Sequence, residues 1–128
     1  MPTNLAAAVY KTMTKTEVLN FVLEIHPHEY EESVMRRWLE ELEEKIACEI
    51  HRLPPRRTHG NAACAVEKLS VPAPYDRVYW AYLVSMIDLT RGDKENYALS
   101  LALFKEAYAE YARFVQRSGK NKKHRALF

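Results

Sequence analysis

The chain has 128 residues, of which 48% are hydrophobic and 28% charged, a composition typical of one globular domain and not of a disordered segment. The net charge of +2 is too small to indicate nucleic-acid binding by itself. Because no apolar run approaches the ~20 residues of a membrane span and no signal peptide is visible, we expect a soluble, intracellular protein without a membrane partner.

The N-terminal residues 1–12 match no periodic pattern well, although residues 5–10 suit a short helical turn. We treat residues 1–13 as an N-terminal extension. Thr14 and Glu17 then have the T-x-x-E spacing of a capping box, which predicts the start of a first helix. This helix should stop near His26, since Pro27 disfavours helix in the residue before it. Its apolar face consists of Val18, Phe21, Val22 and Ile25.

A second helix is predicted over residues 31–52 from apolar positions at helical spacing. Its predicted core positions are Met35, Trp38, Leu39, Leu42, Ile46 and Ile50. The other face alternates Arg and Lys with Glu at i,i+4 spacing, as solvated faces commonly do. Glu40 and Glu44 resemble a pair of catalytic carboxylates, but no pocket-forming residues converge on them, so we favour the solvated face.

Residues 53–73 are predicted to be irregular, opening with Pro54-Pro55. A loop of this length is unusual in a small domain and is often functional, so this loop is a first candidate for a partner contact. Within it, Leu69-Ser70-Val71 alternates like a short strand.

Two long apolar helices, joined by one short turn, are predicted over residues 74–115 and form the centre of the fold. Pro74 suits a first helical turn, and Gly92 and Asp93 suit a left-handed C-cap and the next N-cap. Such a short connection predicts an antiparallel pair. The expected core positions of the two helices are Tyr75, Val78, Tyr79, Tyr82, Leu83, Met86, Tyr97, Leu101, Phe104, Tyr108, Tyr111 and Val115.

The first of these two helices is apolar around most of its circumference and should be buried on most sides. Only a narrow strip of it is small or polar, through Arg77, Ala81, Ser85 and Asp88. The second helix should end near Arg117, where Ser118-Gly119 follows. Residues 118–128 are then a basic, flexible tail.

The sequence offers little chemistry. Cys48-x-x-His51 with His59 and Cys64, and His26-x-His28, are possible zinc ligands, but a second closely spaced ligand pair is missing, so a buried thiol and surface histidines are favoured. No nucleotide-binding, hydrolase or metalloprotease motif is present. We therefore expect no catalytic residue, no cofactor and no metal.

Two basic clusters could contact phosphate groups. A solvated loop and a disordered terminus are the more common explanation of such clusters. The two clusters consist of Arg52, Arg56 and Arg57, and of Lys120, Lys122, Lys123 and Arg125 with the neighbouring Arg117. The tyrosines at helical spacing are more typical of a core, but their number also suits an interface.

The sequence also resembles a known protein family over most of its length. The segment L-S-V-P-A-P-Y-D at 69–76 and the downstream pattern resemble the head-tail connector (adaptor or head-completion) proteins of siphophages and prophages, and the likeness covers residues 14–117. The residues that carry it downstream are Tyr79, Tyr82, Leu83, Met86, Ile87, Asp88, Gly92, Tyr97, Ser100, Ala102, Phe104, Ala107 and Tyr108. Those upstream are Pro27, Tyr30, Arg37, Trp38, Leu39, Leu42 and Ile46.

The resemblance implies an all-α bundle of about four helices that assembles as a ring under the portal, extends the DNA channel and supports tail attachment. It implies as partners further copies of the chain, the portal, the next neck or tail protein and packaged DNA without sequence readout, in the host cytoplasm and then in the virion neck. The candidate oligomer or portal interface is Trp80, Val84, Ala62, Ala63 and Val66, and the basic clusters are candidate DNA-channel or acidic-partner contacts. The alternative is a small DNA-binding regulator or packaging-associated protein of a prophage.

Overall fold

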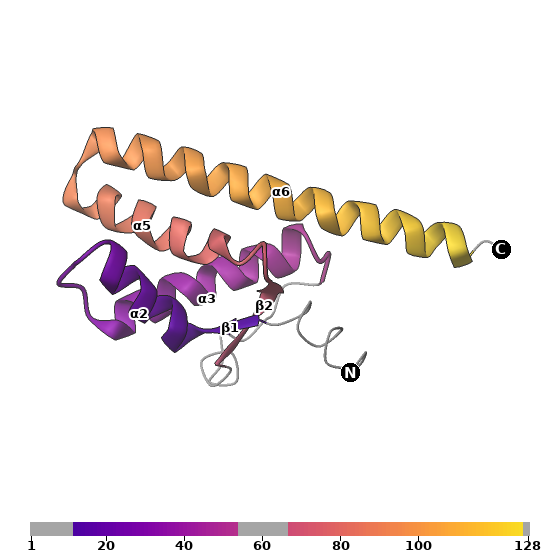
Figure 1. The fold of residues 1–128 in the computed structure, drawn as a ribbon, viewed down its shortest axis with the longest axis horizontal. Helices are drawn as coiled ribbons and strands as arrows, with labels where there is room; N and C mark the ends of the chain where they lie inside the picture. The colour runs from indigo at the N-terminus through magenta and orange to yellow at the C-terminus, as the bar shows by residue number, and fades with distance from the viewer. Residues whose placement is uncertain (1–11, 54–66, 127–128) are drawn as a thin grey trace.

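The computed structural model describes residues 12–53 and 67–126, with side chains described up to residue 119. Within these ranges the elements are β1 (Thr12–Thr14), α2 (Lys15–Ile25), α3 (Glu32–Glu49), β2 (Lys68–Pro72), α5 (Arg77–Arg91) and α6 (Lys94–Ala126). The predicted all-α fold is confirmed, because helices form most of the described chain and its sheet has only two short strands (Figure 1).

The helices form a small bundle with α5 at its centre (Figure 1). The antiparallel helix α6 packs along one side of α5, and α2 and α3 pack along the other. The core lies between these layers and has contributions from most elements. Its buried members include Val18, Val22, Met35, Leu39, Leu42, Ile46, Val71, Val78, Tyr79, Leu83, Ile87, Phe104 and Tyr111.

Helix α2 begins and ends where the sequence predicts. The Thr14 hydroxyl accepts from the Glu17 N–H at 3.2 Å, and the Glu17 carboxylate accepts from the Thr14 N–H at 3.0 Å, so the capping box is complete. His26 is the C-cap, directly before Pro27. Helix α3 is shorter than predicted, because it ends at Glu49 and the chain turns at Arg52, which has a φ of 59°.

The strands β1 and β2 pair antiparallel, with Thr12 beside Pro72 and Thr14 beside Lys68. The alternation predicted for β2 is confirmed, since Leu69 and Val71 are buried and Ser70 is exposed. Strand β1 was not predicted, because three residues are too few to show a period of two. Its first residues belong to the segment assigned to the N-terminal extension, and they pair with β2.

The joint between β2 and α5 corrects one prediction. Pro74 does not lie in the first turn of the helix, because residues 73–76 form a turn and α5 begins at Arg77. The Ala73–Pro74 peptide bond is cis, and the Tyr75 N–H donates to the Pro72 carbonyl at 2.9 Å.

The turn between α5 and α6 agrees with its prediction. Gly92 has a φ of 74° and its N–H caps the end of α5, a left-handed conformation that glycine adopts without steric cost. Asp93 then accepts from the Asn96 N–H at 3.2 Å, as an N-cap does.

Two features of the helix pair differ from simple expectation. The small or polar strip of α5 is deeply buried after Arg77, with Ala81, Ser85 and Asp88 at 0%, 2% and 2% exposure, because the small side chains let neighbouring helices approach and Asp88 has polar partners there. The prediction that α6 ends near Arg117 is wrong, because the helix continues to Ala126. One glycine costs an exposed helix only ~1 kcal/mol, which does not suffice to end it.

Candidate functional site

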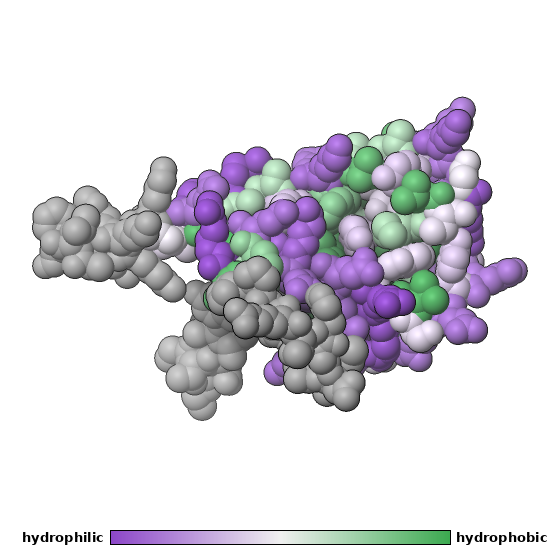
Figure 2. All heavy atoms as spheres, turned by 180° about the vertical axis from the view of Figure 1, so that it is seen from behind, coloured by the Kyte–Doolittle hydropathy of each residue, from purple (hydrophilic) through white to green (hydrophobic). Residues whose placement is uncertain are grey.

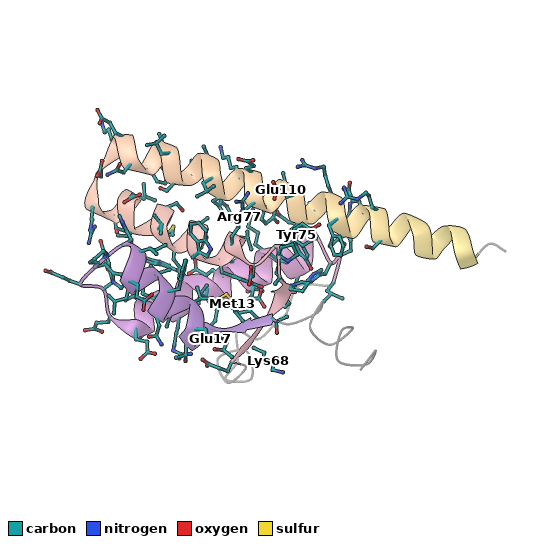
Figure 3. All side chains as sticks on the ribbon, in the orientation of Figure 1. Met13, Glu17, Lys68, Tyr75, Arg77 and Glu110 are labelled. Carbon is teal, nitrogen blue, oxygen red and sulfur yellow. The ribbon has the colours of Figure 1, made fainter. Side chains whose placement is uncertain are left out.

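The antiparallel register of α5 and α6 defines a surface beside the Arg77–Glu110 pair. The Arg77 guanidinium lies 3.6 Å from the Glu110 carboxylate, and the two side chains point toward one another between the helices (Figure 3). Val84 follows Arg77 by about two helical turns, and Leu103 precedes Glu110 by about two turns. Val84 and Leu103 therefore lie on the same flank of the pair as Arg77 and Glu110.

Helix α2 borders this flank. The ring of Phe21 meets the ring of Trp80 edge to face, with centroids 5.7 Å apart, and Ile25 lies one turn after Phe21. Leu99 lies one turn before Leu103 on α6. We call this surface the apolar flank, and its residues are Phe21, Ile25, Trp80, Val84, Leu99 and Leu103. Its outer members are well exposed, at 37% for Phe21, 45% for Ile25 and 71% for Leu99.

The apolar flank contains two of the residues predicted to form an oligomer or portal interface, Trp80 and Val84. Both are half-buried and pack against the core, so each presents only part of its surface. The face seen in Figure 2 mixes hydrophobic residues with many hydrophilic ones.

The other predicted contact residues fall largely outside the described part of the chain. This holds for Arg56, Arg57, Ala62, Ala63 and Val66 in residues 54–66. Arg52 is exposed directly after α3. Lys120, Lys122, Lys123 and Arg125 belong to the backbone helix of α6, but their side chains lie outside the described part.

A buried polar centre, which the sequence did not predict, joins α2, α5 and α6. Asp88 is 2% exposed, and one of its carboxylate oxygens lies 2.9 Å from His26 Nε2. Its other oxygen accepts from the Ser100 hydroxyl at 2.8 Å. One sequence feature could have predicted this centre. Ser85 and Asp88 lie on one strip of an otherwise apolar helix, which indicates a polar partner on a neighbouring helix.

Serine, histidine and aspartate also form hydrolase triads, but this arrangement differs. In a triad the serine is hydrogen-bonded to the histidine, which removes its proton. Here Ser100 donates to Asp88, and its oxygen also approaches the backbone carbonyls of Asn96 and Tyr97. Among the described residues no histidine is hydrogen-bonded to this hydroxyl, so the geometry favours a structural clamp.

A surface cleft lies beside this centre, lined by Pro27, His28, Glu29, Tyr30 and Arg91. The Arg91 guanidinium donates to the Pro27 carbonyl at 2.8 Å, which ties the end of α5 to the loop after α2. Burial and the nearby Arg91 charge lower the pKa of His28, so its neutral form is favoured. Although its Nε2 atom is buried without a hydrogen-bond partner in the described residues, the lining shows no convergent donor set for a ligand.

A second polar cluster ties the joint before α5 to α3. The buried Tyr79 hydroxyl donates to Glu43 at 2.5 Å and accepts from the Val71 N–H at 2.8 Å. Glu43 also accepts from the N–H and the hydroxyl of Ser70, each at 3.0 Å. Burial, and then the Glu43 charge, raise the pKa of Tyr79, so its hydroxyl stays protonated.

A third cluster joins the start of α2 to the segment before β2. Arg36 donates to the Glu67 carboxylate at 2.9 Å, and the Thr16 N–H donates to it at 2.8 Å. These hydrogen bonds lower the pKa of Glu67 to about 2. This surface ion pair holds the residue directly before β2 against α2 and α3.

The aromatic side chains near the middle of α6 close the other end of the bundle. The Tyr108 hydroxyl donates to Glu49 at 2.5 Å, and burial followed by this bond raises its pKa. The Tyr75 ring, labelled in Figure 3, stacks on Phe114 with centroids 4.7 Å apart. Tyr75 and Tyr108, whose residue type also suited an interface, therefore pack against the core of the bundle.

Of the possible zinc ligands, His59 and Cys64 lie outside the described part of the chain, and His51 contacts the aromatic cluster. The Nε2 atom of His51 lies 2.7 Å from the Tyr111 hydroxyl, while Cys48 is a half-buried thiol. Within residues 12–53 and 67–119, no group of three potential ligands is arranged around a metal position.

Comparisons of the chain with protein-family models, curated proteins and solved structures found no match. In the described part of the chain, no helix is both long and apolar enough to cross a membrane.

Proposed function

We propose that the chain is a structural protein of a siphophage or prophage, a head-tail connector that forms a ring under the portal. In this role it extends the DNA channel and supports attachment of the tail. The proposal starts from the sequence resemblance over residues 14–117.

The observation that carries the proposal furthest is the shape of the protomer. A short bundle supports one helix of 33 residues, whose C-terminal part extends past the other elements (Figure 1). A subunit of a closed ring needs two different surfaces that fit each other. The apolar flank and the projecting helix are two different surfaces of one protomer, and in this proposal they supply that pair.

The segment that carries most of the resemblance also has a definite structural role. Residues 69–76 include most of β2 and the turn before α5, and Val71 donates to Tyr79 at the first turn of that helix. This supports the view that the shared pattern specifies the joint between the sheet and the bundle.

Charge placement favours a connector over the alternative, a DNA-binding regulator. A regulator that reads bases presents a recognition helix rich in positive charge. In α5 the charged residues are Arg77, Asp88 and Arg91, and α3 carries more Glu than Arg and Lys. The basic excess lies in the loop after α3 and at the end of α6.

The proposal assigns no reaction to the chain. Deleting the gene from the source phage or prophage, followed by electron microscopy of the induced lysate, tests it. We expect DNA-filled heads and free tails that do not join. Normal tailed particles in the deletion strain would contradict the proposal.

A further inference from the structure

The C-terminal part of α6 lies beyond the bundle. Phe114 stacks on Tyr75 and Val115 still packs against the core, but the helix continues to Ala126. The helical residues after Val115 span about 16 Å at 1.5 Å per residue. A helical segment of this length, without packing, is marginal in water, so a partner that covers it would stabilise it.

The sequence of this segment restricts the partner. After Glu110 the chain contains no acidic residue, whereas Arg117, Lys120, Lys122, Lys123 and Arg125 are basic, and the chain closes with Leu127 and Phe128. A suitable partner surface is therefore acidic at its edge and apolar within.

The apolar flank has these properties. Glu24 is exposed on α2 between Phe21 and Ile25, and Glu95 and Glu106 are exposed on α6 on either side of Leu99. Their spacing from Leu99, one turn before it and two turns after it, places both on the same stripe of the helix.

Two basic residues beside the flank have partners within the chain, while Arg113 is exposed one turn after Glu110 on α6. Arg77 pairs with Glu110, and Arg91 donates to the Pro27 carbonyl. Around Leu99 and Ile25 the flank presents the exposed carboxylates of Glu24, Glu95 and Glu106, while the charges of Arg91 and Arg113 lie farther along the helices. Because the exposed Leu99 and Ile25 lie between these glutamates, the flank is complementary to the C-terminal segment in both charge and hydrophobicity.

We propose that the C-terminal end of α6, residues 117–128, packs against the apolar flank of a second copy of the chain. This inference rests on the proposed function and specifies which surfaces join neighbouring subunits. The two surfaces differ, so the contact is heterologous, and each subunit presents one of each, as a ring requires.

Two full-length variants test this contact. Leu99→Glu disables the flank at a position that is 71% exposed, so folding is preserved. In the tail variant, Lys120, Lys122, Lys123 and Arg125 are all replaced by Gln. Leu23→Glu is the matched control, since Leu23 is also an exposed leucine but lies on the opposite edge of the buried stripe of α2 from Phe21 and Ile25.

Sedimentation velocity over a range of protein concentrations measures self-association, and circular dichroism verifies folding. We expect each variant to associate at least about tenfold more weakly than the wild type, with the control unchanged. An equimolar mixture of the two variants should form a dimer and stop there, because Leu99→Glu retains its tail and the tail variant retains its flank. Added salt should weaken wild-type association.

Three results would overturn the inference: wild-type association by either variant, a mixture that stays monomeric, or a wild-type chain that is monomeric at every concentration. Binding of double-stranded DNA by the tail with unchanged self-association of the tail variant would also overturn it and identify DNA as the occupant. None of these results decides the proposed function, which the composition of phage particles tests separately.

Discussion

The hydroxyl of Tyr79 lies 2.5 Å from the Glu43 carboxylate and simultaneously accepts the Val71 N–H at 2.8 Å. One side chain with 0% exposure thus joins α5, α3 and β2. Tyr79→Phe leaves the Val71 N–H without its acceptor, and an unsatisfied buried donor costs about 1–3 kcal/mol. We expect the free energy of unfolding, measured by urea titration, to fall by that amount.

Tyr97→Phe is the control for this experiment, since it removes the same hydroxyl from a half-buried position on α6 outside the cluster. Its effect should stay within about 0.5 kcal/mol. Equal effects of the two substitutions would show that the Tyr79 hydroxyl does not hold the joint.

Glu67 should make stability depend on pH in the acid range. Its pKa is lowered from 4.5 to about 2 in the folded chain, first by its hydrogen bond with Arg36. A lowered carboxyl pKa stabilises the fold above the unfolded value, and this contribution is lost as the pH falls from 4.5 toward 2. Urea titrations from about pH 5 to about pH 3 should show a shallower decline for Glu67→Gln than for the wild type.

The exposed Glu41 provides the matched control for this pH series. Glu41→Gln should leave the slope of stability against pH close to that of the wild type. If Glu67→Gln also left it unchanged, the ion pair with Arg36 would not contribute in solution.

The clamp at Asp88 predicts energetic coupling between two helices. Asp88→Ala removes the acceptor for Ser100 and the partner of His26, and it should lower the free energy of unfolding by about 1–3 kcal/mol. Ser100→Ala should cost less, because the serine is one of the two partners. A double-mutant cycle should give a coupling of about 0.5–3 kcal/mol, as residues in direct contact do. Strictly additive effects would contradict the clamp.

Replacing each of two glycines by alanine should change stability in opposite directions. Gly92 has a φ of 74° and open space where a methyl group would lie, so Gly92→Ala meets backbone strain alone and should destabilise the fold by about 1 kcal/mol. Gly119 lies within α6, also in open space, so Gly119→Ala should favour helix by about 0.5–1 kcal/mol. Thermal unfolding measures the effect of Gly92→Ala, and amide hydrogen exchange near residue 119 measures the effect of Gly119→Ala. Faster amide exchange in Gly119→Ala than in the wild type would contradict the helical assignment.

Local patterns were sufficient to predict much of the fold. The capping box at Thr14, the glycine cap at Gly92 and the apolar spacing of α3 each depend on neighbouring residues, so the sequence contains them directly. The end of α6 was predicted wrongly, because Gly119 carries only a small helix penalty and does not stop the helix.

The features that were missed depend on contacts between distant segments. His26, Asp88 and Ser100 meet only because α2, α5 and α6 pack together, and β1 exists only because β2 lies beside it. Of the candidate contact residues, Trp80 and Val84 were predicted from the excess of apolar residues on α5. Phe21 and Leu99 complete that surface through the register of the helices, which single-sequence periodicity does not define.

The connector proposal is tested most directly by quantitative mass spectrometry of purified tailed particles, comparing the copy number of this chain with that of the portal. We predict that the chain is present in finished particles at a fixed ratio near one to one. Its absence from particles, while the chain is abundant in the host cell, would contradict the proposal and favour the DNA-binding regulator.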